Sequence, residues 1–141
     1  MIRKVILLAA LFVLFQAPPA VYAADASTPA RAFFVNLKDG DTVTSPVQIK
    51  FGVTGMKIAS AGTDKPNTGH FHLLIDTELT AEQRKFAIPK DDQHLHFGKG
   101  QTETALDLKP GKHTLQIVMG DGGHMLHNPP VMSDKISVTV E

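Results

Sequence analysis

Short apolar segments recur along the chain from residue 31 onward, and most alternate apolar and polar side chains instead of following helical spacing. In residues 47–53 every second side chain is apolar, with the polar Gln48 and Lys50 between them. This period of two is that of a β-strand with one buried face. Turn residues separate the segments of this kind, which we predict as strands over residues 31–37, 47–53, 70–76, 94–97, 102–108, 113–119 and 135–140.

The number and spacing of these segments indicate the fold class. Several short strands with turn signals every 8 to 12 residues or so are typical of an all-β protein. We predict an immunoglobulin-like β-sandwich of about seven strands, with a small β-barrel as the alternative. The Pro-Gly turn at residues 109–112 predicts a hairpin between its two flanking strands. The capping-box pattern from Thr80 to Gln83 predicts a short helix before Pro89.

The first 23 residues differ from the rest of the chain. They begin with Arg3 and Lys4, continue with 11 apolar residues at positions 5–15, and end in small residues up to Ala23. This is the pattern of a secretory signal peptide, and the apolar run is about half of the ~20 residues that a membrane span needs. We therefore expect a signal peptide over residues 1–23, a single domain over residues 31–141, and a periplasmic protein with no membrane span after cleavage.

Charge and cysteine content exclude several kinds of site. Of the 14 basic side chains two lie in the first 23 residues, which leaves 12 basic against 14 acidic side chains in the remainder. Binding of nucleic acid needs a basic face, so we expect no nucleic-acid partner. The chain has no cysteine. Disulfides, thiolate nucleophiles and cysteine-ligated metal sites are therefore excluded.

Histidine is the residue type whose pattern points to chemistry. All seven histidines lie between residues 70 and 127, as two H-x-H pairs, one H-x-x-H pair and one single residue. The period of a strand places both imidazoles of an H-x-H pair on one face, about 6.5 to 7 Å apart at the backbone. Imidazole without thiolate suits copper or zinc. We predict a copper or zinc ion held by the two H-x-H pairs, His70, His72, His94 and His96, with His124 and His127 as outer candidates.

The remaining histidine and the nearby acids have other interpretations. His113 shares its face with Leu115 and Ile117, so we expect it to pack and hydrogen-bond at the edge of the core. Asp91 and Asp92 precede a histidine pair, where they either orient an imidazole or form a solvated turn. No residue is assigned a catalytic role.

Three function classes follow from these observations. The first is a soluble periplasmic protein that binds a transition-metal ion through its paired histidines. The second is a metal-free accessory module whose exposed histidine face binds an envelope protein or a glycan. The third, a metal-dependent enzyme, is the least favoured, because no glutamate lies within or next to either H-x-H pair to act as a base.

Three segments carry a resemblance to a known family. Residues 68–76, 94–103 and 108–116 resemble, in order, motifs of the exported bacterial domain-of-unknown-function family 4399. The resemblance runs from about residue 33 to residue 140. It implies a compact β-sandwich and no particular activity. Residues 69–72 are also similar to the H-x-H strand of copper-zinc superoxide dismutases, although this chain lacks the cysteine pair of those proteins.

Overall fold

The computed structural model describes residues 29–141. The predicted signal peptide, residues 1–23, lies outside the described residues. Within these residues, nine strands and one short 3₁₀ helix follow in the order β1 (Arg31–Phe34), β2 (Thr42–Val43), β3 (Val47–Thr54), β4 (Lys57–Ile58), β5 (Thr68–Ile75), η1 (Gln83–Lys85), β6 (His94–His96), β7 (Glu103–Leu106), β8 (Gly111–Gly120) and β9 (Ile136–Val140).

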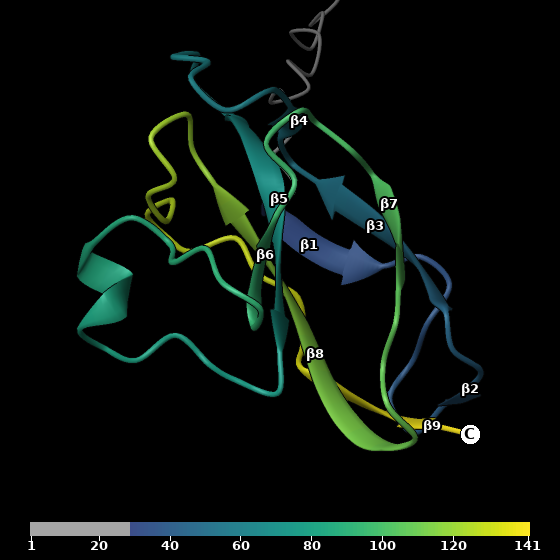
Figure 1. The fold of residues 1–141 in the computed structure, drawn as a ribbon. Helices are drawn as coiled ribbons and strands as arrows, with labels where there is room; N and C mark the ends of the chain where they lie inside the picture. Colours follow the sequence, from purple (N-terminus) through teal and green to yellow (C-terminus); the bar gives the residue numbers. More distant parts are fainter. Residues whose placement is uncertain (1–28) are drawn as a thin grey trace, which may run out of the picture.

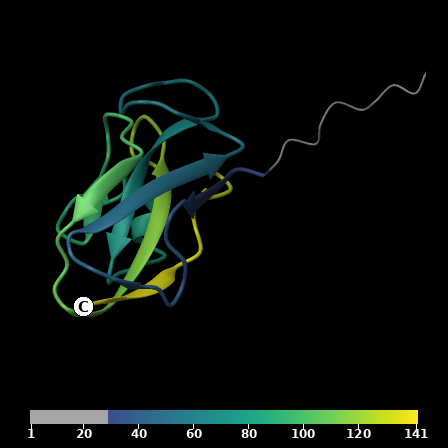
Figure 2. The same cartoon turned by 90° about the vertical axis from the view of Figure 1, so that its right-hand side faces the viewer.

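The strands form two sheets. The smaller sheet has the order β1-β3-β7, and the larger one has the order β2-β9-β8-β5-β4, with β6 pairing with β5 beside β4. Figure 1 shows the smaller sheet at the right of β5 and β8, and Figure 2 shows it in front of them. The predicted all-β sandwich is confirmed, and the strands within residues 29–141 do not close into a barrel. No helix in this part of the chain is long and apolar enough to span a membrane.

The core lies between the two sheets. Phe71 and Leu73 of β5 are fully buried there, as is Ile49 of β3. The Phe51 ring lies 5.2 Å from that of Phe71 and 4.8 Å from that of Phe97, in tilted arrangements favourable for aromatic pairs. Burying a large apolar side chain contributes roughly 1.5–3 kcal/mol to stability. This face of the larger sheet therefore supplies much of the stability of the fold.

The turn at residues 109–112 does not connect a hairpin. It joins β7 to β8, and β7 pairs with β3 while β8 pairs with β5 and β9. The hairpin prediction was wrong, because the turn residues dictate only a local reversal of the chain. Which strands pair afterwards depends on where their apolar faces become buried. Here the chain crosses from one sheet to the other.

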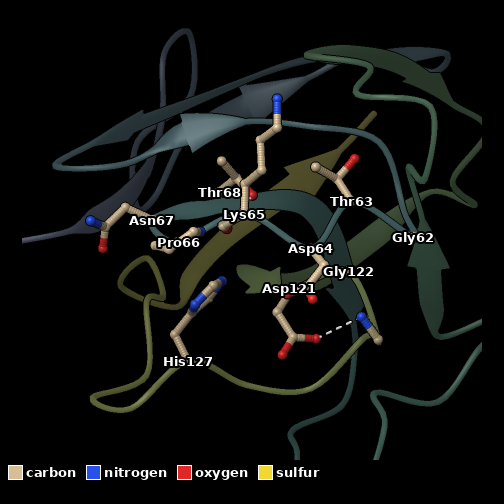
Figure 3. A pocket seen from close by; sticks show the side chains of 11 residues that line it. Gly62, Thr63, Asp64, Lys65, Pro66, Asn67, Thr68, Asp121, Gly122 and His127 are labelled. Carbon is tan, nitrogen blue, oxygen red and sulfur yellow. Dashed lines mark hydrogen bonds between the residues drawn. The ribbon is translucent and has the colours of Figure 1, made fainter.

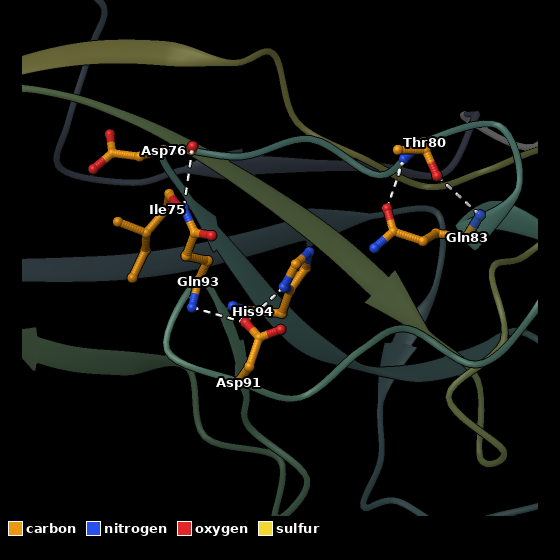
Figure 4. Close-up of polar contacts among 7 residues, drawn as sticks. All are labelled: Ile75, Asp76, Thr80, Gln83, Asp91, Gln93 and His94. Carbon is orange, nitrogen blue, oxygen red and sulfur yellow. Dashed lines mark hydrogen bonds and ion pairs between the residues drawn. The ribbon is translucent and has the colours of Figure 1, made fainter.

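The predicted short helix forms as η1, a single 3₁₀ turn at Gln83–Lys85. The Thr80 backbone N–H donates to Gln83 Oε1 at 2.9 Å, and the Gln83 N–H donates to Thr80 Oγ1 at 3.2 Å (Figure 4). This reciprocal pair is the capping box expected from the sequence. It stabilises the segment that connects β5 to β6.

The outer face of the larger sheet is covered by two loops. Residues 76–93, which include η1, and residues 121–132 lie at the left of β5 in Figure 1. They bury a second apolar cluster, Leu74, Leu79, Ile88 and Val118. The Ile88 N–H donates to the His124 carbonyl oxygen at 2.9 Å and so ties the two loops together. Strand β5 is therefore buried on both faces.

Candidate metal centre

Four histidines converge on the outer face of the larger sheet. His70 and His72 come from β5, His96 from β6, and His124 from the loop after β8. We call these four residues the histidine cluster. The six distances between their ring centroids are all between 4.8 and 5.9 Å. Four imidazoles from three separate segments of the chain thus meet at one place.

The distances between ring nitrogens fit a metal site. The Nε2 atoms of His70 and His72 lie 3.1 Å apart, and those of His96 and His124 also lie 3.1 Å apart. A tetrahedral zinc ion with Zn–N bonds of about 2.0–2.1 Å separates its ligand nitrogens by about 3.3 Å. The ligand atoms of His70, His96 and His124 all lie within 4.8 Å of one another. This triad could hold a metal ion, with His72 as an adjacent fourth donor.

Strand register places the first three rings. His72 is directly opposite His96 on β6, and His70 is directly opposite Gly120 on β8. A Cβ atom at Gly120 would lie 2.8 Å from His72 Nε2, and one at Gly98 would overlap the His96 ring. Because both positions are glycine, the imidazoles can lean together in space that side chains would otherwise fill. The role of these two glycines was not predicted from the sequence. The available signal was their position, since Gly98 follows His96 by two residues and Gly120 precedes His124 by four.

The loop after β8 supplies the fourth ring. Oδ1 of Asp121 accepts hydrogen bonds from the N–H groups of Gly123 and Met125, both at 2.8 Å. The His124 N–H donates to the Asp121 carbonyl oxygen at 2.9 Å, which closes a tight turn. His124 has a φ of 67°, a left-handed conformation that costs a non-glycine residue on the order of 1–2 kcal/mol. The turn thus holds this histidine in a strained conformation beside the other three.

Burial keeps the imidazoles of His70 and His72, the two inner rings of the histidine cluster, neutral. His70 and His72 are 0% and 1% exposed. Burial first, and then the neighbouring histidines, lowers the pKa of His70 to about 4 and that of His72 to about 3. Burial, with smaller contributions from the charges of His124 and Lys90, also lowers the pKa of His96. Neutral imidazoles carry the lone pair that a metal ion needs.

The inner rings are also incompletely hydrogen-bonded. The Nδ1 atoms of His70 and His72 are buried, and neither has a hydrogen-bond partner among the described residues. An unpaired buried polar atom typically costs about 1–3 kcal/mol. These two rings therefore do not have the hydrogen-bonding pattern of histidines that serve only to stabilise a fold.

His94 lies next to the histidine cluster but outside it. It is opposite Leu74, two residues further along the sheet than the His72–His96 pair. Its Nδ1 lies 2.7 Å from Asp91 Oδ1, as Figure 4 shows, while its buried Nε2 has no partner within residues 29–141. The hydrogen bond to His94 is the largest cause of the lowered pKa of Asp91. Of the two interpretations of this acid, the structure supports the one in which it orients an imidazole.

His127 also lies outside the histidine cluster. It is beside Asp121 in a pocket of about 510 Å³ between the loop of residues 62–68 and the loop of residues 121–127 (Figure 3). Its Nε2 is buried with no hydrogen-bond partner in the described part of the chain. Of the six predicted ligands the structure thus brings four together. It places the outer candidate His124 in the histidine cluster and leaves His94 and His127 outside it, so that the binding of an ion by these two residues stays a prediction.

The seventh histidine lies near the other end of β8. His113 Nδ1 is 2.7 Å from Asp76 Oδ2, and its Nε2 is 2.9 Å from the Lys109 carbonyl oxygen. The hydrogen bond to Asp76, and then the one to Lys109, raises the pKa of His113. Its place and its partners fit the hydrogen-bonded position at the edge of the core that the sequence predicts.

The histidine cluster is open on one side. A cavity of about 400 Å³ is lined by three of its rings and by the loop before β6: His72, Ala87, Ile88, Lys90, His96 and His124. We call it the histidine cavity. His70 does not line it, so this fully buried ring lies behind the other three. An ion held by the histidine cluster would be accessible to small molecules from this side.

The fold and the site together define a class: a β-sandwich whose larger sheet carries a histidine group that could hold a metal ion. The chain belongs to the family described as Domain of unknown function (DUF4399), whose sequence model matches residues 49–141. The resemblance found in the sequence is therefore confirmed. No curated protein and no solved structure matches the chain.

Proposed function

We propose that this protein binds one transition-metal ion, copper or zinc, through the histidine cluster, and that it carries or buffers that ion in the periplasm. The observation that carries the proposal is the convergence of ring nitrogens, with two Nε2 pairs at 3.1 Å from three segments of the chain. Four nitrogen donors without a thiolate suit Cu(II) and Zn(II). The periplasmic location rests on the signal-peptide pattern of residues 1–23.

The protonation states of the inner rings support this proposal. With pKa values of about 4 and about 3, His70 and His72 are neutral at pH 7 and need lose no proton to bind an ion.

A partner protein or a glycan stays a prediction. That alternative requires exposed histidines, whereas His70, His72 and His94 are at most 5% exposed. Any contact between the histidine cluster and a partner would therefore have to use its two half-buried members, His96 and His124.

The test is calorimetric titration of Cu(II) and Zn(II) into the parent protein and into the variants His96→Gln and His124→Gln. These two ligands are half-buried, so their replacement by a polar side chain should preserve the fold. We expect one ion per parent chain and a loss of affinity of more than about 100-fold in each variant. Removing a group that only orients a ligand already weakens metal binding about 10- to 100-fold.

The matched control is His113→Gln, which removes a histidine remote from the site and should leave the affinity unchanged. Thermal unfolding followed by circular dichroism checks that every variant is folded. Absence of binding by the parent, or equal affinity in the parent and both ligand variants, would overturn the proposal.

A further inference from the structure

We propose that the metal-loaded histidine cluster takes a small carboxylate anion as an additional ligand, bound in the histidine cavity beside Lys90. This inference rests on the proposed function, because the carboxylate oxygen would bind to the ion. It goes further in naming a ligand class and the residues that select it.

Charge is the first argument. Neutral imidazoles leave the charge of a divalent ion uncompensated, and the histidine cavity adds the positive charge of Lys90. None of the described residues that line this cavity is acidic. Asp121, whose charge acts on His70, lines the other pocket and already accepts two backbone hydrogen bonds. The protein therefore presents a positive cavity with no negative group of its own in the lining.

The lining of the cavity is the second argument. Ala87 and Ile88 supply a hydrocarbon wall of the cavity, in addition to Lys90 and the histidine rings. Ile88 is only 5% exposed and belongs to the apolar cluster under the loop, so this wall is held in place. A carboxylate with a short hydrocarbon chain matches both parts of the lining, because its oxygen reaches the ion and its apolar end contacts Ala87 and Ile88. An inorganic anion would match only the positive charge of the cavity and would leave its apolar wall without a contact.

Access and size are the third argument. Three rings of the histidine cluster face the cavity, so a ligand inside it can approach the ion directly. Its volume of about 400 Å³ leaves room for a molecule of several non-hydrogen atoms. Small-molecule sites typically fall between about 300 and 1,000 Å³ and combine an apolar lining with a few polar groups.

The experiment uses azide as a spectroscopic probe. The protein is loaded with Cu(II), or with Co(II) as a stand-in for Zn(II), according to which ion the calorimetric titration shows to bind. Azide is then titrated while a charge-transfer absorption band is recorded, and acetate, butyrate and phosphate are tested as competitors. We expect an azide band that butyrate removes at lower concentration than acetate, and acetate at lower concentration than phosphate.

Variants test the role of the lysine. Lys90→Gln should weaken azide binding by about 1.5-fold to fivefold, the range expected for an ion pair near the surface, and Lys90→Arg should restore it. Lys85→Gln is the matched control, since Lys85 is in the same loop and pairs with Glu82 instead of lining the cavity.

The outcomes separate this inference from the proposed function. A metal-loaded protein that gives no azide band refutes the inference while the metal site stands. Phosphate competing as well as butyrate refutes the assignment to carboxylates, and equal azide affinity in the parent and Lys90→Gln refutes the role of the lysine. Failure of the parent to bind metal ends both proposals.

Discussion

The two faces of β5 are equally buried but differ in chemistry. On β5, Phe71 and Leu73 face the smaller sheet, while His70 and His72 face the two covering loops, and all four are at most 1% exposed. Burial of the hydrocarbon face stabilises the fold by roughly 1.5–3 kcal/mol per large side chain. Burial of an imidazole with an unpaired nitrogen costs about 1–3 kcal/mol instead. One strand thus buries hydrocarbon on its inner face and, on its outer face, imidazoles of a group that could hold a metal ion.

Burial alone therefore does not reveal what a residue contributes to the stability of the fold. The inner face follows the usual rule that interiors are apolar and tightly packed. The outer face departs from it by burying His70 and His72, whose Nδ1 atoms have no partner among the described residues. Such departures from local consistency are expected at functional sites.

The largest expected effect is on the inner face. Phe71→Ala should lower the free energy of unfolding by about 3–5 kcal/mol, because it leaves a cavity among fully buried neighbours. Urea denaturation measures this loss. The control is Phe86→Ala, whose side chain is 61% exposed and should change stability by less than about 0.5 kcal/mol. Similar losses in the two variants would contradict the assignment of the core to this face.

Acidification should act on the outer face. The pKa values of His70 and His72 in the folded state, about 4 and about 3, lie below the unfolded value of 6.5. Between these values the unfolded chain binds more protons, so stability falls as the pH drops from about 6.5 toward 4. The expected loss is roughly 1.4 kcal/mol per pH unit for each ring that is protonated in the unfolded chain and stays neutral in the folded protein.

Urea denaturation of the metal-free protein between pH 7 and 4.5 measures this loss. The His70→Gln/His72→Gln double variant should show a flatter profile than the parent. His113→Gln provides a contrast of opposite sign. The raised pKa of His113 contributes stability that is present in acid and is lost as the pH rises through its folded pKa, so this variant should lose stability mainly at low pH. A parent profile no steeper than that of the double variant would refute the account of the buried rings.

The smallest expected change in stability tests the difference between the two faces of β5 most directly. His72→Leu places a hydrocarbon side chain beside Val118 and Ile88 and removes an unpaired buried nitrogen. We expect the metal-free variant to be as stable as the parent, or more stable by up to about 1–3 kcal/mol, while its metal affinity falls. Thermal unfolding and metal titration on the same samples measure both quantities. A clear loss of stability would mean that the imidazole contributes to the fold itself.

Several features of the site could be predicted from the sequence. The H-x-H spacing predicts that His70 and His72 share a face, because alternate side chains of a strand point the same way. By the same period of two, Phe71 and Leu73 belong to the opposite, apolar face. The absence of cysteine excluded thiolate ligands from any metal site. The β-sandwich followed from the number and spacing of the strands.

Other features could not be predicted in this way. His94 and His96 have the same pattern in the sequence, yet only His96 falls opposite His72, while His94 falls opposite Leu74. His124 and His127 form the H-x-x-H pair, and the sequence does not distinguish them as ligands. The tight turn around Asp121 brings only His124 into the histidine cluster.

The sequence by itself determined which side chains share a face of each strand and which kinds of ligand atom are available, because strand periodicity and side-chain chemistry are local properties. Only the tertiary structure decided which of seven histidines meet. Strand register and loop conformation depend on packing between distant segments, and a shift of one residue would send the rings to the other face of the sheet.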